Sequence, residues 1–204
     1  ADLKKAIAAG KVQKLPKFGE QTAKKILEGI EMKTKDQGRR PIGTVFLTVE
    51  SILENLKKCP DVKQVVPAGS FRRTEETVGD IDILATGKNA AKIMEYFKKQ
   101  PYIMKVVGEG PTKMTILTQD SLQVDLRVVE PHLFGSALQY FTGSKLHNVH
   151  LRTLLKAKGF KLSEYGFFKG KKLMASKNEE ECYNAIGLHY IPPEIRTDTG
   201  EIEA

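Results

Sequence analysis

Two aspartates, Asp80 and Asp82, are the residues whose type and spacing first indicate chemistry. They lie in the segment GDIDIL (residues 79–84), where polar and apolar residues alternate. This alternation predicts a half-buried strand with both carboxylates on one face. Two neighbouring carboxylates repel each other and are costly to bury unless a cation lies between them. Oxygen ligands with room for substrate phosphates suit Mg²⁺ better than zinc.

A glycine and a serine, Gly69 and Ser70, precede this pair and follow an apolar run at residues 62–68 that predicts a neighbouring strand. Glycine lets the backbone approach a ligand closely, and a serine hydroxyl with free backbone N–H groups can hold phosphate oxygens. An Asp-x-Asp pair alone is a weak signal, because surface strands carry such pairs by chance. The whole unit, which also contains Arg72 and Arg73, favours a nucleoside triphosphate site.

A third carboxylate, Asp125, lies in a later strand. Residues 103–107, 113–117 and 122–129 are predicted strands, and the turn-forming residues 118–121 make the last two a hairpin. Asp125 is flanked by apolar residues and is in phase with Arg127. Because an ionised aspartate in a central strand needs compensation, we expect it to join Asp80 and Asp82 at one site.

Helices are predicted on both sides of this region. A helix from residue 42 should pack across the sheet, and others are predicted at residues 2–9, 89–99, 135–141, 145–158 and 179–186. Short strands are expected at residues 160–173, and the segment from residue 191 reads as a tail or linker. In the helix from residue 42 the predicted core positions are Val45, Phe46, Val49, Ile52, Leu53 and Leu56. In the basic helix 145–158 the predicted packing side is Leu146, Val149, Leu154 and Leu155, with Lys145, Arg152, Lys156 and Lys158 exposed.

The amino-terminal residues 14–30 predict two short helices joined by a Pro-x-x-Gly turn that ends at Gly19. Backbone N–H groups at the second helix start are free to meet a DNA phosphate, and Lys17, Lys24 and Lys25 add positive charge. An ordinary helical hairpin used only for packing is the alternative. Residues 33–41 are polar and read as a linker.

The composition favours a nucleic-acid partner. The 204 residues carry a formal net charge of +8, and no apolar run is long enough to span a bilayer. Cys59 and Cys182 lie far apart with no metal-type spacing, so no disulfide framework is indicated. We therefore expect an intracellular, cytoplasmic and nucleoid-associated monomer with no membrane partner.

The segment GSFRRTEETVGDIDIL (residues 69–84) resembles the nucleotidyltransferase superfamily, and its closest resemblance is to the family X DNA polymerases. A second block, QVDLR (residues 123–127) followed by LQYFTGS (residues 138–144), is similar to the same family. The resemblance implies an α+β fold, with a palm of mixed β-sheet flanked by helices at residues 39–134. It also implies a helix-hairpin-helix subdomain that binds the DNA backbone at residues 1–38, and a nucleotide-selection, thumb-type α+β subdomain at residues 135–204.

The resemblance further implies two-metal phosphoryl transfer with two Mg²⁺ or Mn²⁺ ions. Asp80 and Asp82 would bind both ions, and Asp125 the ion that activates the primer 3′-hydroxyl. Substrates would be gapped or primer-template DNA and deoxynucleoside triphosphates. The implied nucleotide contacts are Gly69, Ser70, Arg73, Gly79, Tyr140, Phe141, Gly143 and Asn148, with the two aromatic side chains against the sugar. The implied DNA contacts are Lys17, Gly19, Lys24, Arg127 and Arg152.

The sequence departs from the family pattern in several places. Gln123 stands where an arginine often precedes the third aspartate, Lys145 where an acidic residue often follows the serine, and Lys17 where the hairpin often has glycine. Arg39 and Arg40 could reach a triphosphate in the family's geometry, but two arginines before a proline are more often solvated. The end of the chain resembles a junction to a PHP-type phosphoesterase domain. We therefore expect a catalytic core that lacks this domain and the amino-terminal lyase-type domain.

Three functions compete at this point. The first is a template-directed polymerase that fills short gaps in DNA repair, including base excision repair. The second is a template-independent nucleotidyltransferase, and the third is a DNA-binding module with a silent site. The helical hairpin and Arg152 favour the first, and the three crowded carboxylates argue against the third.

Overall fold

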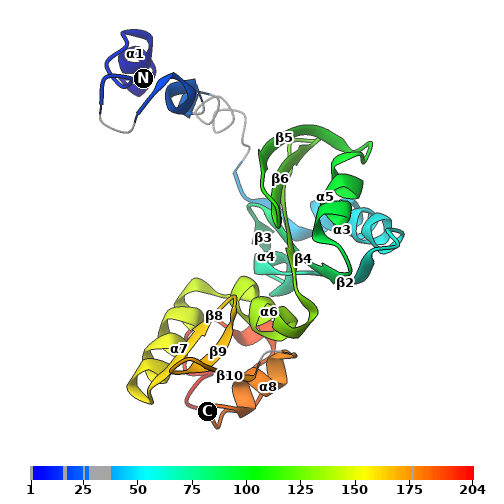
Figure 1. Ribbon diagram of the computed structural model, residues 1–204, viewed down its shortest axis with the longest axis vertical. Helices are drawn as coiled ribbons and strands as arrows, with labels where there is room; N and C mark the ends of the chain where they lie inside the picture. The colour runs from blue at the N-terminus through cyan, green and yellow to red at the C-terminus, as the bar shows by residue number, and fades with distance from the viewer. Residues whose placement is uncertain (1, 16–17, 25, 28–37, 176) are drawn as a thin grey trace. The chain divides into compact units, whose positions relative to one another are not determined.

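The computed structural model describes residues 2–15, 18–24, 26–27, 38–175 and 177–204 (Figure 1). The chain divides into two compact units, Ala1–Gly38 and Arg39–Ala204. In the first unit, helix α1 (Asp2–Ala8) and the helical residues 20–24 and 26–27 bury a small apolar cluster that includes Ile7, Val12 and Ala23. Among the described helices, none combines the length and apolar content that a membrane crossing requires.

A five-stranded mixed sheet organises the second unit. Its strand order is β2-β4-β7-β6-β5, and β4 and β7 form its parallel pair, whereas the other neighbours are antiparallel. A parallel pair requires a long crossover between its strands, and here the chain between β4 and β7 supplies helix α5 and the β5–β6 hairpin. The strands are β2 (Val62–Pro67), β4 (Ile81–Gly87), β5 (Ile103–Glu109), β6 (Lys113–Thr118) and β7 (Gln123–Val129).

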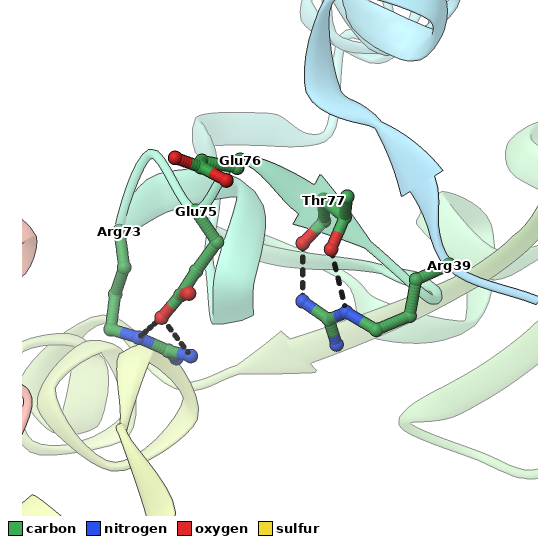
Figure 2. A pocket seen from close by; sticks show the side chains of 5 residues that line it. All are labelled: Arg39, Arg73, Glu75, Glu76 and Thr77. Atoms are coloured by element: carbon green, nitrogen blue, oxygen red, sulfur yellow. Dashed lines mark hydrogen bonds and ion pairs between the residues drawn. The ribbon is translucent and has the colours of Figure 1, made fainter.

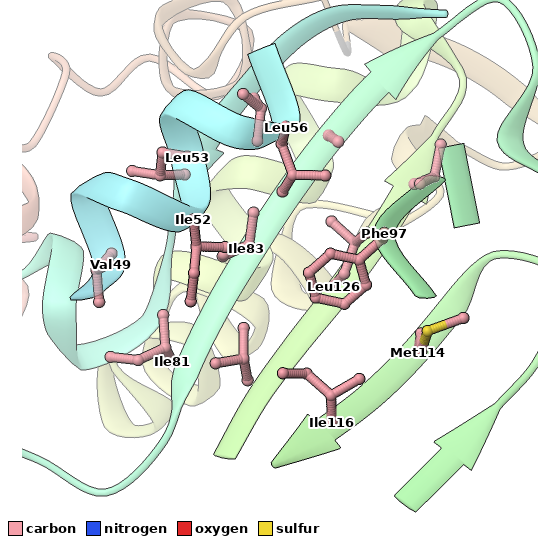
Figure 3. Close-up of a cluster of buried hydrophobic side chains, with 14 of the residues drawn as sticks. Val49, Ile52, Leu53, Leu56, Ile81, Ile83, Phe97, Met114, Ile116 and Leu126 are labelled. Carbon is pink, nitrogen blue, oxygen red and sulfur yellow. The ribbon is translucent and has the colours of Figure 1, made fainter. Parts of the chain in front are cut away.

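One face of this sheet is closed by two helices, α3 (Ile42–Lys57) and α5 (Ala90–Lys98). Figure 3 shows α3 lying across β4, with Ile52 close to Ile81 and Ile83. Helix α3 forms because its apolar residues recur with the helical period. Asn89 caps the start of α5, since its side chain accepts a hydrogen bond from the Lys92 N–H at 3.1 Å. This face holds the main apolar core.

The opposite face is only partly covered. Helix α6 (Phe134–Thr142), which follows the short 3₁₀ helix η1 (Pro131–Leu133), packs on Leu84 of β4. The four-residue helix α4 (Gly69–Arg72) lies at the end of β2, and a small antiparallel pair, β1 (Arg40–Pro41) with β3 (Thr77–Val78), lies beside it. The half of the face that carries Asp82 and Asp125 is left for polar groups.

The carboxyl-terminal elements build a second core. Helix α7 (Lys145–Ala157), the antiparallel strands β8 (Phe160–Ser163), β9 (Gly166–Lys169) and β10 (Lys172–Ala175), helix α8 (Glu179–Asn184) and the 3₁₀ helix η2 (Pro193–Ile195) lie together (Figure 1). Their shared core contains Leu151, Leu155, Leu162, Phe167, Tyr183, Ile186, Ile191 and Ile202.

The helices and strands predicted between residues 42 and 186 are confirmed in type and order. The second helix predicted within residues 14–30 and the linker predicted at residues 33–41 lie partly outside the described residues, and Arg40–Pro41 of that linker forms strand β1. Some details of packing were wrong. Phe46 is 49% exposed, with its ring centroid 6.1 Å from that of Phe71, because it lies beside the buried stripe of α3 that begins at Val45 rather than within it. On α7 the buried side is His147, Asn148, Leu151 and Leu155, so Leu146, Val149 and Leu154 are exposed.

The segment from Ile191 is not a free tail. Ile191 and Ile202 are buried in the second core, and the buried Arg196 pairs with Glu179 of α8. Cys59 and Cys182 are both buried, and neither is in a disulfide.

Candidate active site

Asp82 and Asp125 are register partners on the parallel strands β4 and β7. Along β7 every second residue is buried, and the buried residues Val124 and Leu126 belong to the core under α3 and α5. Asp125 therefore points to the opposite face, and Asp82 shares that face because neighbours in register on a pleated sheet point the same way. Asp80 is exposed in the bend just before β4. The sequence pattern predicted a strand that included Asp80, but β4 begins one residue later, at Ile81.

The three carboxylates influence one another electrostatically. Burial, and then the negative charges of Asp80 and Asp125, raise the pKa of Asp82 to about 6. The positive charges of Arg127 and Lys113 act in the opposite direction. A raised carboxyl pKa means that the ionised form lacks sufficient compensation from the protein's own cations. The structure thus brings the three predicted ligands into one electrostatic cluster.

The donor set fits hard divalent cations, because it consists of carboxylate oxygens on one sheet face. As the described residues stand, however, no three acidic, imidazole or thiol groups surround one point as ligands of a single ion. Asp125 instead pairs with Lys113, with Nζ 2.6 Å from Oδ2. Gln123, on the same strand, lies at the limit of a hydrogen bond to Asp125, with Nε2 3.5 Å from Oδ1.

Gly69 lies against the carboxylate cluster. Its φ is +58°, and a Cβ at this position would overlap Oδ2 of Asp82. A side chain there would be excluded by the backbone conformation and by the contact together. The neighbouring Ala68 N–H donates to the carbonyl oxygen of Asp82 at 2.7 Å, which holds α4 to β4. Ser70, half-buried, follows in the first turn of α4.

A polar pocket of about 490 Å³ lies beside this region (Figure 2). Arg73 enters it and bonds Glu75, with Nη2 3.2 Å from Oε1, while its Nη1 donates to the carbonyl oxygen of Thr142 at 2.5 Å. From the other side Arg39 donates to the backbone and hydroxyl oxygens of Thr77. The pocket therefore holds two guanidinium groups near the predicted phosphate cradle.

Of the two arginines before Pro41, Arg39 is exposed, as expected, whereas Arg40 is not fully exposed. Arg39 lines the pocket, and Gly79 lies beside its side chain. Arg40 is largely buried and donates to the carbonyl oxygen of Asp120 at 2.6 Å. The sequence did not assign a role to either residue, because Arg39 pairs with Thr77 and Arg40 with Asp120, which lie 38 and 80 residues away.

The aromatic turn connects this face to helices α6 and α7. Tyr140 and Phe141 meet edge to face with ring centroids 5.2 Å apart, and the Arg127 guanidinium lies 4.4 Å from the Phe141 ring. Gly143, with φ of +76°, bends the chain between the helices as predicted, and a Cβ there would lie 3.0 Å from Nη1 of Arg73. The turn, Arg73 and Arg127 are thus packed together.

Asn148 is buried and its side chain is already engaged. Its Oδ1 accepts from Gln139 at 2.9 Å and its Nδ2 donates to the carbonyl oxygen of Tyr140 at 2.7 Å. These bonds hold α6 to α7, so contact with a base would require Asn148 to exchange a partner. Arg152 is exposed, donates to the Asn148 carbonyl oxygen at 3.0 Å and lies 6.0 Å from the Tyr140 ring.

Sequence reasoning missed a buried ion cluster that joins α4 to the carboxyl-terminal elements. Arg72 binds Glu179 through two bonds, of which Nη2 to Oε2 is 2.5 Å. The fully buried Arg196 donates to the same carboxylate at 2.7 Å. The segment from residue 191 was predicted as a tail or linker, so the sequence did not indicate that Arg196 forms a buried ion pair.

The predicted DNA contacts of the amino-terminal unit are partly described. Gly19 and Lys24 are exposed, and Lys24 lies in the helical segment at residues 20–24. Lys17 and Lys25 lie outside the described residues. Their roles in DNA binding stay predictions.

Comparison with known families now decides the classification. A family model described as DNA polymerase beta palm matches residues 39–154, and one described as DNA polymerase beta thumb matches residues 137–197. The first covers more than half of the chain. The chain belongs to the family X DNA polymerases.

This family X chain is 35% identical over 205 residues to DNA polymerase/3'-5' exonuclease PolX of Bacillus subtilis, a match that covers 98% of the chain and 36% of that relative. It is 29% identical over 143 residues to Repair DNA polymerase X of African swine fever virus, covering 66% of the chain and 82% of the viral protein.

The fold is also that of solved family members. Leishmania infantum polymerase beta in a ternary gap complex has a TM-score of 0.76 at 20% identity, and the match covers 96% of this chain and 80% of that one. The five-stranded sheet with its helices is thus a polymerase beta-type palm, and the carboxyl-terminal elements are a thumb.

Proposed function

We propose that this chain is the catalytic core of a DNA-directed DNA polymerase that adds deoxynucleotides to a primer 3′-hydroxyl in short gaps during DNA repair. The observation that carries the proposal is the register of Asp82 and Asp125 on the parallel strands, opposite the closed core, with Asp80 coupled to them. Relatives named as repair polymerases support the repair context.

Divalent cations, Mg²⁺ or Mn²⁺, would supply Lewis acidity and charge neutralisation at this cluster. Asp80 and Asp82 would hold both ions, and Asp125 the one near the primer hydroxyl. Burial, and then like-charge crowding, raise the pKa of Asp82, so cation binding would relieve an existing repulsion. The protein's contribution is alignment and charge compensation rather than covalent chemistry.

The remaining site residues would orient the nucleotide. Gly69 keeps the backbone close to Asp82, and Ser70 and Gly79 would offer a hydroxyl and backbone groups to the phosphates. Arg73 would exchange Glu75 for a phosphate oxygen, because a guanidinium binds phosphate with two parallel bonds. The pocket position of Arg39 supports the same role for it.

The aromatic turn would bind the sugar and base of the incoming nucleotide. Tyr140 and Phe141 offer ring surfaces next to Arg127, and Gly143 lets Arg73 approach the turn. Asn148 would reach the base only after releasing Gln139 or Tyr140. Arg152, exposed on α7, would contact the template strand.

We further propose the division of labour that the sequence indicates. Residues 1–38 would bind the DNA backbone, residues 39–134 would perform catalysis, and residues 135–204 would select the nucleotide. The protein would act as an intracellular monomer on gapped or primer-template DNA. The net charge of +8 supports a polyanionic partner.

The test is extension of a one-nucleotide gapped duplex with each deoxynucleotide supplied singly. We expect incorporation that follows the template base, and Asp125→Ala should lose about a hundredfold to a thousandfold or more. Glu109→Ala, on β5 of the same sheet but outside the cluster, is the matched control and should retain activity. Unchanged extension by Asp125→Ala would contradict the proposal, and incorporation that ignores the template would favour a template-independent transferase.

A further inference from the structure

Lys113 reaches Asp125 from the neighbouring strand β6. Lys113 is the register partner of Arg127, and Thr115 that of Asp125, so these four residues share the carboxylate face of the sheet. The Lys113 Nζ lies 2.6 Å from Asp125 Oδ2, and the two side chains are 42% and 12% exposed. A mobile, half-solvated ammonium group therefore neutralises a largely buried carboxylate.

Gln123 and Arg127, on the same face, do not take the place of Lys113 as the charge that neutralises Asp125. Gln123 is uncharged and lies 3.5 Å from the other carboxylate oxygen of Asp125. Arg127 lies over the Phe141 ring, at 4.4 Å, and its planar group is held there by the aromatic turn. The compensating charge for Asp125 thus comes from a side chain that can rotate into solvent.

We propose that Lys113 is a positioning residue of the metal site: its ammonium group holds Asp125 as a stand-in cation and is displaced when a divalent cation binds Asp125. This inference rests on the proposed function, because it assumes that Asp125 is a metal ligand. An ammonium group and a divalent ion on the same carboxylate oxygen repel each other strongly at such distances. The lysine therefore competes with the ion, and its flexible stem lets it leave at low cost.

The competition has a measurable consequence for the protein without DNA or nucleotide. Replacing Lys113 by methionine keeps the length and removes the charge, so a divalent cation no longer has to displace an ammonium group. We expect Lys113→Met to bind Mn²⁺ about threefold to tenfold more tightly, as judged from hydrogen bonds to charged groups and exposed ion pairs. Titration followed by electron paramagnetic resonance of free Mn²⁺ measures this directly.

Two controls separate direct competition from a general change of charge. Lys98→Met removes the same charge from another ion pair, with Glu109 at 2.7 Å, and should leave Mn²⁺ affinity unchanged. Lys113→Arg keeps the charge and should retain the weaker affinity of the wild type. The difference should persist at high ionic strength, because salt screens a distant charge but not a contact.

Thermal melting supplies a second readout. In EDTA, Lys113→Met should melt below the wild type because Asp125 loses its partner, and Mg²⁺ should raise its melting temperature by more than it raises that of the wild type. Equal or weaker Mn²⁺ binding by Lys113→Met, in a wild type whose Mn²⁺ binding depends on Asp125, would overturn the inference and leave the proposed function intact. Absence of any Asp125-dependent Mn²⁺ binding would instead count against the proposed function.

Discussion

Two clusters of charged side chains lie at the two ends of the short helix α4. At its first residue, Gly69 touches the cluster of Asp80, Asp82 and Asp125, where like charges meet. At its last residue, Arg72 enters a cluster with Glu179 and Arg196, where opposite charges alternate. Asp82, Glu179 and Arg196 are each largely buried, yet the first cluster brings like charges together and the second pairs opposite charges.

The difference teaches how to distinguish a functional charge cluster from a structural one. Glu179 receives bonds from both arginines, and Arg196 also donates to the Ile191 carbonyl oxygen at 2.9 Å, so opposite charges are paired, although Nη2 of Arg196 has no hydrogen-bond partner among the described residues. In the carboxylate cluster the pKa of Asp82 rises to about 6 instead, chiefly through burial and then repulsion. Such a cost in the folded protein is expected where an external cation completes the arrangement.

The largest effect should follow from breaking the cluster of Arg72, Glu179 and Arg196. Glu179→Ala leaves Arg196 buried without its carboxylate, and loss of one partner of a buried pair costs about 3–5 kcal/mol. Urea unfolding should show this loss, whereas Glu180→Ala, exposed on the same helix, should change stability by less than about 0.5 kcal/mol. A cost below about 1 kcal/mol for Glu179→Ala would mean that the cluster is not structural.

The opposite sign is expected in the carboxylate cluster. Asp82→Asn removes one repelling charge and keeps the shape, so in EDTA at pH 8 it should stabilise the protein by about 1–3 kcal/mol, since each pKa unit corresponds to about 1.4 kcal/mol. Gap filling should be lost in the same variant. Glu109→Gln, in an exposed pair, serves as the control in the same unfolding assay. Destabilisation by Asp82→Asn would refute the conflict described above.

The stabilisation by Asp82→Asn should also depend on pH. A carboxyl whose folded pKa is raised binds protons in the folded state between pH 3.8 and about 6, so wild-type stability falls as pH rises through this window. The advantage of the variant should therefore be full above about pH 6 and should fade towards pH 4. A pH-independent difference in unfolding free energy, measured in EDTA, would assign the effect to packing instead.

A smaller effect is expected where the carboxyl-terminal segment docks on α7. Nδ1 of the buried His147 lies 2.7 Å from Oε1 of Glu201, whose pKa falls to about 2 because bonds from His147 and from backbone N–H groups outweigh its burial. Glu201→Gln should cost about 1 kcal/mol at neutral pH. The difference from wild type should disappear as pH falls from 4.5 towards 2, because a lowered pKa stabilises only above that range.

Circular dichroism melts between pH 2 and 7 would measure the Glu201 effect. Asp198 and Arg196 also lie close to this pair and are unchanged in the variant, so the comparison between variant and wild type isolates Glu201. An unchanged acid profile would mean that the Glu201 bond does not help to hold the segment, which leaves that role to contacts such as those of Ile191, Arg196 and Ile202.

Much of the palm was predictable because its information is local. The period-two pattern of β4 and β7 and the helical period of α3 specify which side chains share a face, and Asp82 and Asp125 share theirs as expected. The predictions failed where packing partners come from distant segments. Phe46 and Leu146 fit a helical period but are 49% and 61% exposed, because the period alone does not say which distant segment will cover a position.

The sequence by itself was enough to single out the aspartates, the Gly-Ser turn and the aromatic turn as site residues, since short motifs depend only on neighbouring residues. Only the tertiary structure decided that Lys113 neutralises Asp125, that Arg72 and Arg196 share Glu179, and that Arg39 and Arg73 line one pocket. Charge pairing acts over a few ångströms of space whatever the separation in sequence, so it becomes readable only once folding has brought the partners together.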